Sequence, residues 1–192
     1  MRIAIIGAGN VGKALGEGWA RKHEVQYIKR GASLDERAKL STEADAVVLA
    51  TPADQVKAAV SGLPLAGKTL IDCTNPLKAD LRGLEMGHTT SAAEQLAAVV
   101  PDAKVVKAFN TVGFGIMANP RFGGSKAMMM IASDDAGAKQ KTMTLAADLG
   151  FEPIDAGPLA QSRLLEPLAM LWISLAIKGG LGREFAFGML RR

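Results

Sequence analysis

The residues best suited to chemistry stand at the start of the chain, where an apolar run leads directly into the glycine pattern G-x-G-x-x-G. The pattern comprises Gly7, Ala8, Gly9, Asn10, Val11 and Gly12. Its first glycine permits a tight turn, the second leaves room for a pyrophosphate, and the third lets the next helix pack closely. A helix over residues 11–22 would present free N–H groups to the phosphates. The pattern predicts a dinucleotide site; the alternative is a glycine turn without a ligand.

The end of the second predicted strand indicates which dinucleotide binds. That strand covers residues 24–28 and is followed by Lys29 and Arg30, with Ser33 nearby. Enzymes that use NAD carry an acidic residue at about this position for the ribose 2′-hydroxyl. Arg30 can instead hold a 2′-phosphate through paired charge-assisted hydrogen bonds, and Lys29 adds a point charge. The sequence therefore favours NADP over NAD; the alternative is a solvated basic turn.

Alternating strands and helices must position these residues. The pattern predicts an α/β fold, a single-domain Rossmann-like, doubly wound and mainly parallel sheet with a C-terminal helix, over residues 1–192. The predicted strands cover residues 2–6, 24–28, 46–50, 69–72, 104–108, 128–132 and 152–155. The predicted helices cover residues 11–22, 35–40, 53–60, 92–99 and 136–149, and a last helix runs from Gly157-Pro158 to Lys178. Residues 109–126 show neither period and predict a long loop, which is often functional.

Further candidates follow the carboxyl ends of the predicted strands, where an open parallel sheet binds its ligands. They are Thr51, Pro52, Thr74, Asn75, Pro76, Asn110 and Thr111. We expect Thr51 and Pro52 on the adenine and ribose side, and the others nearer the nicotinamide. Thr51 could alternatively cap the helix over residues 53–60, with proline in its first position.

Residues for acid–base or nucleophilic chemistry are few. His23 suits the end of a helix, His88 lies in a glycine-flanked loop, and Cys73 ends a buried strand. Because these residues are far apart in the sequence, we expect no metal site. A chain with so few acids and bases suits direct hydride transfer, in which the cofactors carry the chemistry.

Composition narrows the compartment and the partners. The net charge is +4, but the cations are scattered and aromatic residues make up 5%, so nucleic acid is not an expected partner. The apolar stretch over residues 164–177 is too short for a membrane span. A single cysteine excludes an intrachain disulfide and favours a reducing cytoplasm, and the N-terminus does not resemble a signal peptide.

The last predicted helix is apolar around much of its circumference. Its apolar residues include Leu164, Leu165, Leu168, Leu171, Trp172, Leu175 and Ala176. One face of a sheet would not bury all of them, so we expect a homodimer in which residues 158–192 make the subunit contact. The alternative is a purely intramolecular core.

The chain resembles the family of F420-dependent NADP oxidoreductases. The resemblance extends over essentially the whole chain and is carried by four motifs. These are the glycine fingerprint, Asp72-Cys73-Thr74-Asn75-Pro76-Leu77, Lys107-Ala108-Phe109-Asn110-Thr111, and Asp155-Ala156-Gly157-Pro158-Leu159 followed by Ser162-Arg163-Leu164. It implies hydride transfer between NADP(H) and a deazaflavin, coenzyme F420.

The resemblance also implies where the hydride acceptor binds. Two segments would face the acceptor ring: Asn110, Thr111 and Val112, and Gly157, Pro158 and Leu159. Archaeal members carry histidine in place of Asn110, whereas the Phe-Asn-Thr form resembles bacterial relatives and the cytosolic domain of metalloreductases, which use a flavin. Ser162 and Arg163 could instead be ordinary helix residues, with Arg163 paired to Glu166.

Two other functions remain open. One is a small-molecule imine or carbonyl reductase related to pyrroline-5-carboxylate reductase, although few residues remain for its helical substrate domain. The other is a non-catalytic sensor that binds NADP and a protein partner.

Overall fold

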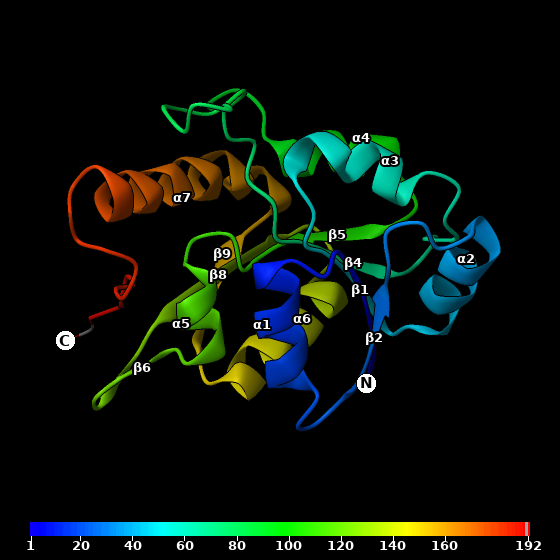
Figure 1. Cartoon of the computed structure of the whole chain (residues 1–192), viewed down its shortest axis with the longest axis horizontal. Coiled ribbons are helices and arrows are strands. Elements are labelled where there is room, and N and C mark those ends of the chain that lie inside the picture. Colours follow the sequence, from blue (N-terminus) through cyan, green and yellow to red (C-terminus); the bar gives the residue numbers. More distant parts are fainter. Residues whose placement is uncertain (191) are drawn as a thin grey trace.

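The computed structural model describes residues 1–190 and 192. Within this part of the chain, seven strands form one sheet in the order β2-β1-β3-β4-β5-β8-β9, and β6 and β7 form a separate hairpin (Figure 1). Strands β1 to β5 are parallel to one another. Their carboxyl ends therefore meet at one edge of the sheet, as the alternating pattern predicts.

The strands and helices have the following bounds. The strands are β1 (Arg2–Ile6), β2 (Glu24–Ile28), β3 (Ala46–Leu49), β4 (Thr69–Asp72), β5 (Lys104–Lys107), β6 (Arg121–Phe122), β7 (Ser125–Lys126), β8 (Met128–Ser133) and β9 (Glu152–Gly157). The helices are α1 (Asn10–Trp19), α2 (Leu34–Glu43), α3 (Val56–Val60), α4 (Ala92–Val99), α5 (Phe114–Ala118), α6 (Ala136–Leu149) and α7 (Ser162–Ile177). Two 3₁₀ turns, η1 (Ala53–Gln55) and η2 (Leu159–Gln161), precede α3 and α7.

Two strands run against the rest of the sheet. Strand β8 pairs antiparallel with β5, and β9 pairs parallel with β8. The reason lies in the segment between β5 and β8: it contains α5 and the β6–β7 hairpin and no crossover to the opposite edge. The prediction of a structureless loop over residues 109–126 was therefore wrong, and β8 and β9 run in the opposite direction to β1 to β5.

Several predicted helix ends also need correction. The helix predicted over residues 53–60 begins with η1, whose N-cap is Pro52, so Thr51 does not cap it. The last helix begins at Ser162 because Gly157, with a φ of +99°, still belongs to β9. Helices α4 and α6 have the predicted bounds, and Ser91 and Asp135 cap them as hydrogen-bond acceptors.

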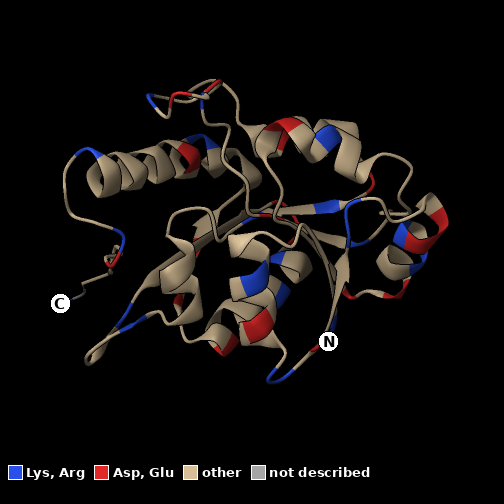
Figure 2. Ribbon diagram, viewed as in Figure 1, with Lys and Arg blue, Asp and Glu red and all other residues tan. Residues whose placement is uncertain are grey.

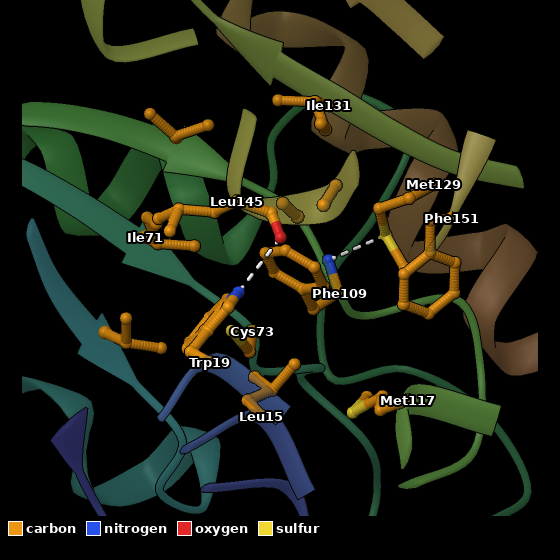
Figure 3. Packing of buried hydrophobic residues seen from close by; sticks show 14 of the residues in the cluster. Leu15, Trp19, Ile71, Cys73, Phe109, Met117, Met129, Ile131, Leu145 and Phe151 are labelled. Atoms are coloured by element: carbon orange, nitrogen blue, oxygen red, sulfur yellow. Dashed lines mark hydrogen bonds between the residues drawn. The ribbon is translucent and has the colours of Figure 1, made fainter. Parts of the chain in front are cut away.

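The larger core lies between the sheet and α1, α5 and α6, and its centre is Phe109 (Figure 3). The Phe109 ring makes edge contacts with Trp19 and Phe151, and its backbone N–H points at the sulfur of Met129. This bulky residue has a φ of +58°, a conformation that costs energy and persists only where packing enforces it. Its packed ring therefore fixes the turn that carries Asn110.

The opposite face of the sheet is covered by α2, α3 and α4, with α7 beside α4 (Figure 1). Lys and Arg are spread over most elements and interspersed with Asp and Glu (Figure 2). Among the described residues, no helix is both long and apolar enough to cross a membrane.

Candidate functional site

A cavity of about 540 Å³ opens at the carboxyl edge of β1, β2 and β3. The residues that line it come from the ends of these strands and from η1, α2 and α3. They include Gly7, Ala8, Gly9, Lys29, Arg30, Arg37, Thr51, Pro52 and Gln55. Its volume lies in the range of small-molecule and cofactor sites. The structure thus brings the predicted phosphate turn and the predicted basic turn into one cavity.

The glycine turn has the geometry that a phosphate site needs. A Cβ at Gly7 would collide with the Ala50 carbonyl, and one at Gly12 would collide with the Gly7 carbonyl, whereas one at Gly9 would meet nothing within 4 Å. Gly9 is the N-cap of α1, and neither a side-chain cap nor an acidic residue occupies the first turn. The first N–H groups of α1 are therefore free to bind an anion.

The remaining residues of the glycine pattern do not line the cavity. Asn10 is exposed at the start of α1, Val11 packs against the larger core, and Gly12 is buried. Their contribution to a ligand would come from the backbone of the helix and not from their side chains.

The other end of the cavity is basic. Lys29 and Arg30 are exposed, and the guanidinium of Arg30 makes a single 3.3 Å hydrogen bond, to Gln55 Oε1. Sequence reasoning missed Arg37, which lines the same cavity and donates to the Ala58 and Ala59 carbonyls. The sequence did contain a signal for Arg37. This residue lies one helical turn after Ser33, whose hydroxyl accepts a hydrogen bond from the Glu36 N–H and caps α2. Among the described lining residues there are three cations and no carboxylate.

A second cavity, of about 770 Å³, adjoins the first at Pro52, which lines both. Thr74, Asn75 and Pro76 lie on its wall, as do residues of the loop that connects β4 to α4. Thr51 lies beside Pro52 in the first cavity, and its buried Oγ1 has no hydrogen-bond partner among the described residues. The two cavities thus share one lining residue and follow the carboxyl edge from β2 to β4.

Comparison with known proteins agrees with this geometry. Residues 2–76, which contain the glycine turn, the basic turn and Thr74 to Pro76, match the family model described as NADP oxidoreductase, coenzyme F420-dependent. The crystal structure of a candidate F420-dependent NADP reductase from Arthrobacter sp. FB24 superposes with a TM-score of 0.87. It is 31% identical, and the alignment covers 98% of this chain and 99% of that one. The chain belongs to the F420-dependent NADP oxidoreductase family.

Other relatives include a further F420-dependent NADP reductase and a metalloreductase. The F420-dependent NADP reductase of Methanocaldococcus jannaschii is 29% identical over 188 residues, which cover 91% of this chain and 82% of that protein. The metalloreductase STEAP3 of Rattus norvegicus is 38% identical over 110 residues, or 56% of this chain. The chain spans only 21% of the length of that metalloreductase, so the likeness concerns one part of it.

The family resemblance also implied acceptor contacts from Asn110, Thr111 and Val112, and the structure buries all three. The Asn110 amide donates to Asn75 Oδ1 at 3.0 Å and to the Leu165 carbonyl at 3.1 Å, and Asn75 Nδ2 donates to the Asn110 carbonyl at 2.8 Å. Asn110 Oδ1 has no partner among the described residues. Asn110 thus fixes the position of Asn75, which lines the second cavity, although Asn110 itself does not line it.

The second implied acceptor segment lies elsewhere. Gly157 ends β9, and Pro158 and Leu159 follow it; the Leu159 N–H donates to Asp134 just beyond β8. Leu159 is buried in the smaller core under α4. The three residues line neither of the two cavities, so their contact with an acceptor stays a prediction.

The expected pair of Arg163 and Glu166 is also absent among the described residues, because each has a different partner. Arg163 binds the Glu94 carboxylate at 2.6 to 3.1 Å and lowers the pKa of Glu94. Glu166 is fully buried and lies 2.9 Å from Lys107 Nζ. Lys107 was missed, although a lysine at the end of the apolar run in β5 is a signal for a buried ionic partner.

Cys73 is a buried structural residue, as its place at the end of a buried strand predicts. Its side chain is 7% exposed, and burial raises the pKa of the thiol well above its usual range. It is therefore not a thiolate at neutral pH and cannot serve as a nucleophile there.

Proposed function

We propose that the protein is an NADP(H)-dependent oxidoreductase that transfers a hydride between NADP(H) and a deazaflavin, coenzyme F420, or a flavin. The observation that carries the proposal is the first cavity, which joins an uncapped helix N-terminus behind Gly9 to Lys29, Arg30 and Arg37. An anion at each end is what a pyrophosphate and a 2′-phosphate supply. The relative from Methanocaldococcus jannaschii is an F420-dependent NADP reductase.

The candidate residues along the carboxyl edge of the sheet would each bind a different part of NADP(H). Backbone N–H groups after Gly9 would bind the pyrophosphate, Arg30 and Lys29 the 2′-phosphate, and Thr51 and Pro52 the adenosine ribose. Thr74, Asn75 and Pro76 would hold the nicotinamide half. When bound, the nicotinamide supplies the hydride. The protein would then contribute position and exclusion of water, while the cofactors carry the hydride chemistry.

The second cavity supports an acceptor of considerable size. Its lining combines apolar residues such as Leu77, Met86 and Leu96 with eight polar or charged residues: Asp54, Lys57, Asp72, Thr74, Asn75, Lys78, Glu85 and Gln95. A planar deazaflavin or flavin ring carries polar groups at its edge, so it suits a wall that is partly apolar and partly polar. Asn110 would act on this acceptor by orienting Asn75. Gly157, Pro158 and Leu159 line neither cavity, so only the family resemblance supports their contact with the acceptor.

Stopped-flow oxidation of NADPH against panels of deazaflavin, flavin and imine acceptors tests the function. Turnover with coenzyme F420 or a flavin supports the proposal, turnover only with imines favours a small-molecule reductase, and binding without any turnover favours a sensor. The readout is the rate of loss of NADPH absorbance at saturating nucleotide.

Asn110→Leu is expected to slow hydride transfer while leaving NADPH affinity nearly unchanged. The leucine removes the amide that holds Asn75 but touches neither the glycine turn nor the basic turn. A polar contact that matters at the reacting end affects the transition state more than nucleotide binding. Unchanged transfer with every acceptor would confine Asn110 to loop architecture.

We further propose that the protein is cytoplasmic and forms a homodimer through α7 and the residues that follow it. Leu164, Leu171 and Ile177 on α7 are 66%, 50% and 52% exposed, which is unusual for large apolar side chains on one helix. Light scattering of the purified protein is expected to give twice the monomer mass. A Leu171→Asp variant is expected to shift that mass toward the monomer, and a monomeric wild type would contradict the proposal.

A further inference from the structure

Three buried charged side chains link β4, β5 and α7 directly behind the second cavity. Lys107 Nζ lies 2.9 Å from Asp72 Oδ2 and 2.9 Å from Glu166 Oε1. All three side chains are at most 1% exposed. Burial alone would lower the pKa of Lys107, but the two carboxylates outweigh it and raise that pKa. The ammonium therefore stays charged inside the protein.

This triad holds the backbone N–H and the backbone carbonyl of one residue on the cavity wall. Lys107 Nζ donates to the Thr74 carbonyl at 2.6 Å, and the Thr74 N–H donates to Asp72 Oδ1 at 2.9 Å. Hydrogen bonds to charged groups are shorter and stronger than neutral ones. The conformation of Thr74, and with it the direction in which Asn75 leaves the turn, is thus set by buried charge.

The triad also reaches the cavity through α4. The Glu166 carboxylate accepts hydrogen bonds from the Ala92 and Ala93 N–H groups at 3.0 and 3.2 Å, at the N-terminus of α4. Ala92 lines the second cavity. One ammonium therefore connects two separate parts of the cavity wall, while none of its contacts reaches the first cavity.

We propose that Lys107 is a positioning residue for hydride transfer, acting through Asp72 and Glu166 on the Thr74–Asn75 turn and on the N-terminus of α4. The inference rests on the proposed function, because it assigns the nicotinamide half and its acceptor to this part of the edge. Hydride transfer depends steeply on the distance between the reacting atoms, so a small displacement of the wall lowers the rate. The adenosine half binds in the other cavity and does not depend on Lys107.

The test is Lys107→Met, measured by two readouts. The affinity for 2′,5′-ADP, a probe of the first cavity alone, is expected to stay within about twofold of wild type. The rate of hydride transfer at saturating NADPH is expected to fall about 10²-fold, as for a misplacement of about 1 Å. Lys104→Met is the matched control: it removes an ion-paired lysine from the other end of β5 and is expected to change neither readout.

A second variant keeps the proposal testable if the buried carboxylates prevent Lys107→Met from folding. Lys107→Met combined with Glu166→Gln leaves only Asp72 charged, so the triad keeps its net charge of −1. This variant is expected to bind 2′,5′-ADP normally and to transfer hydride as slowly as the single variant. A transfer rate close to wild type, or a loss of 2′,5′-ADP binding of the same size as the loss of rate, would overturn the proposal.

A double-mutant cycle with Asn75→Ala shows whether Lys107 acts through the turn. The loss of rate in the double variant is expected to be no larger than in the worse single variant, because both changes disturb one unit. Losses that multiply would overturn the proposal. If the wild type fails to bind 2′,5′-ADP at all, the proposed function is wrong, which separates that failure from a failure of the role of Lys107.

Discussion

Gly9→Val is expected to leave the chain folded and to remove measurable binding of both NADPH and NADH. A side chain at position 9 meets no protein atom within 4 Å, and its φ of −76° and ψ of −170° suit a β-branched residue. The added methyl groups would occupy the space in which the pyrophosphate approaches the first N–H groups of α1. Losing two hydrogen bonds to a charged group, at about 1.5–3 kcal/mol each, weakens binding by at least about a hundredfold.

Titration calorimetry with both nucleotides measures this loss, and circular dichroism confirms that the variant is folded. Gly124→Val is the matched control, since a side chain there also meets nothing within 4 Å but lies in the β6–β7 hairpin. Gly12→Val is expected to fail differently, by unfolding, because its side chain would collide with the Gly7 carbonyl. If folded Gly9→Val binds NADPH within a few-fold of wild type, the phosphate does not bind at this turn.

Arg30→Ala is expected to weaken NADPH binding by roughly ten- to a hundredfold and to leave NADH binding nearly unchanged. The Arg30 side chain is exposed at the cavity and held only by a long hydrogen bond to Gln55, so it is free to reach a ligand. NADH lacks the 2′-phosphate and therefore does not lose this contact. The remaining cations, Lys29 and Arg37, keep part of the attraction and limit the size of the effect.

Salt provides an independent check of the same assignment. Exposed charges are screened at moderate ionic strength, so added salt is expected to weaken NADPH binding more than NADH binding, and less so in Arg30→Ala. Arg21→Ala, which removes an exposed cation beyond the end of α1, is the control and is expected to leave both affinities unchanged. Equal losses for the two nucleotides, or tighter NADH than NADPH binding in the wild type, would contradict NADP as the cofactor.

Local patterns of the sequence predict the nucleotide half of this site. A buried strand that ends in G-x-G-x-x-G constrains the backbone by steric exclusion, and the collisions at Gly7 and Gly12 show that this constraint operates here. The basic turn follows β2 directly, so its position at the edge depends only on the parallel order of β1 and β2. Such features act over a few residues and can be recognised in one sequence.

The acceptor half depends on contacts between distant segments. Periodicity shows that β8 and β9 are strands but not in which direction they run, because strands buried on both faces look alike either way. That direction decides where the end of β9 lies: Gly157 pairs with Ala132, which pairs with Lys107 at the end of β5. The short elements between β5 and β8 set the direction of β8, and such short elements show no strong hydrophobic periodicity in the sequence.

The sequence by itself thus determined a mainly parallel Rossmann-like sheet and the backbone of the glycine turn, and it predicts the preference for a 2′-phosphate. Only the tertiary structure decided the reversal of β8 and β9, the place of Arg37 in the first cavity, and the pairing of Lys107 with Asp72 and Glu166. The physical reason is that steric and capping preferences are local, whereas a buried charge selects its partner by proximity in the folded chain. That proximity is created by packing α7 against α4 and β5, which no local pattern encodes.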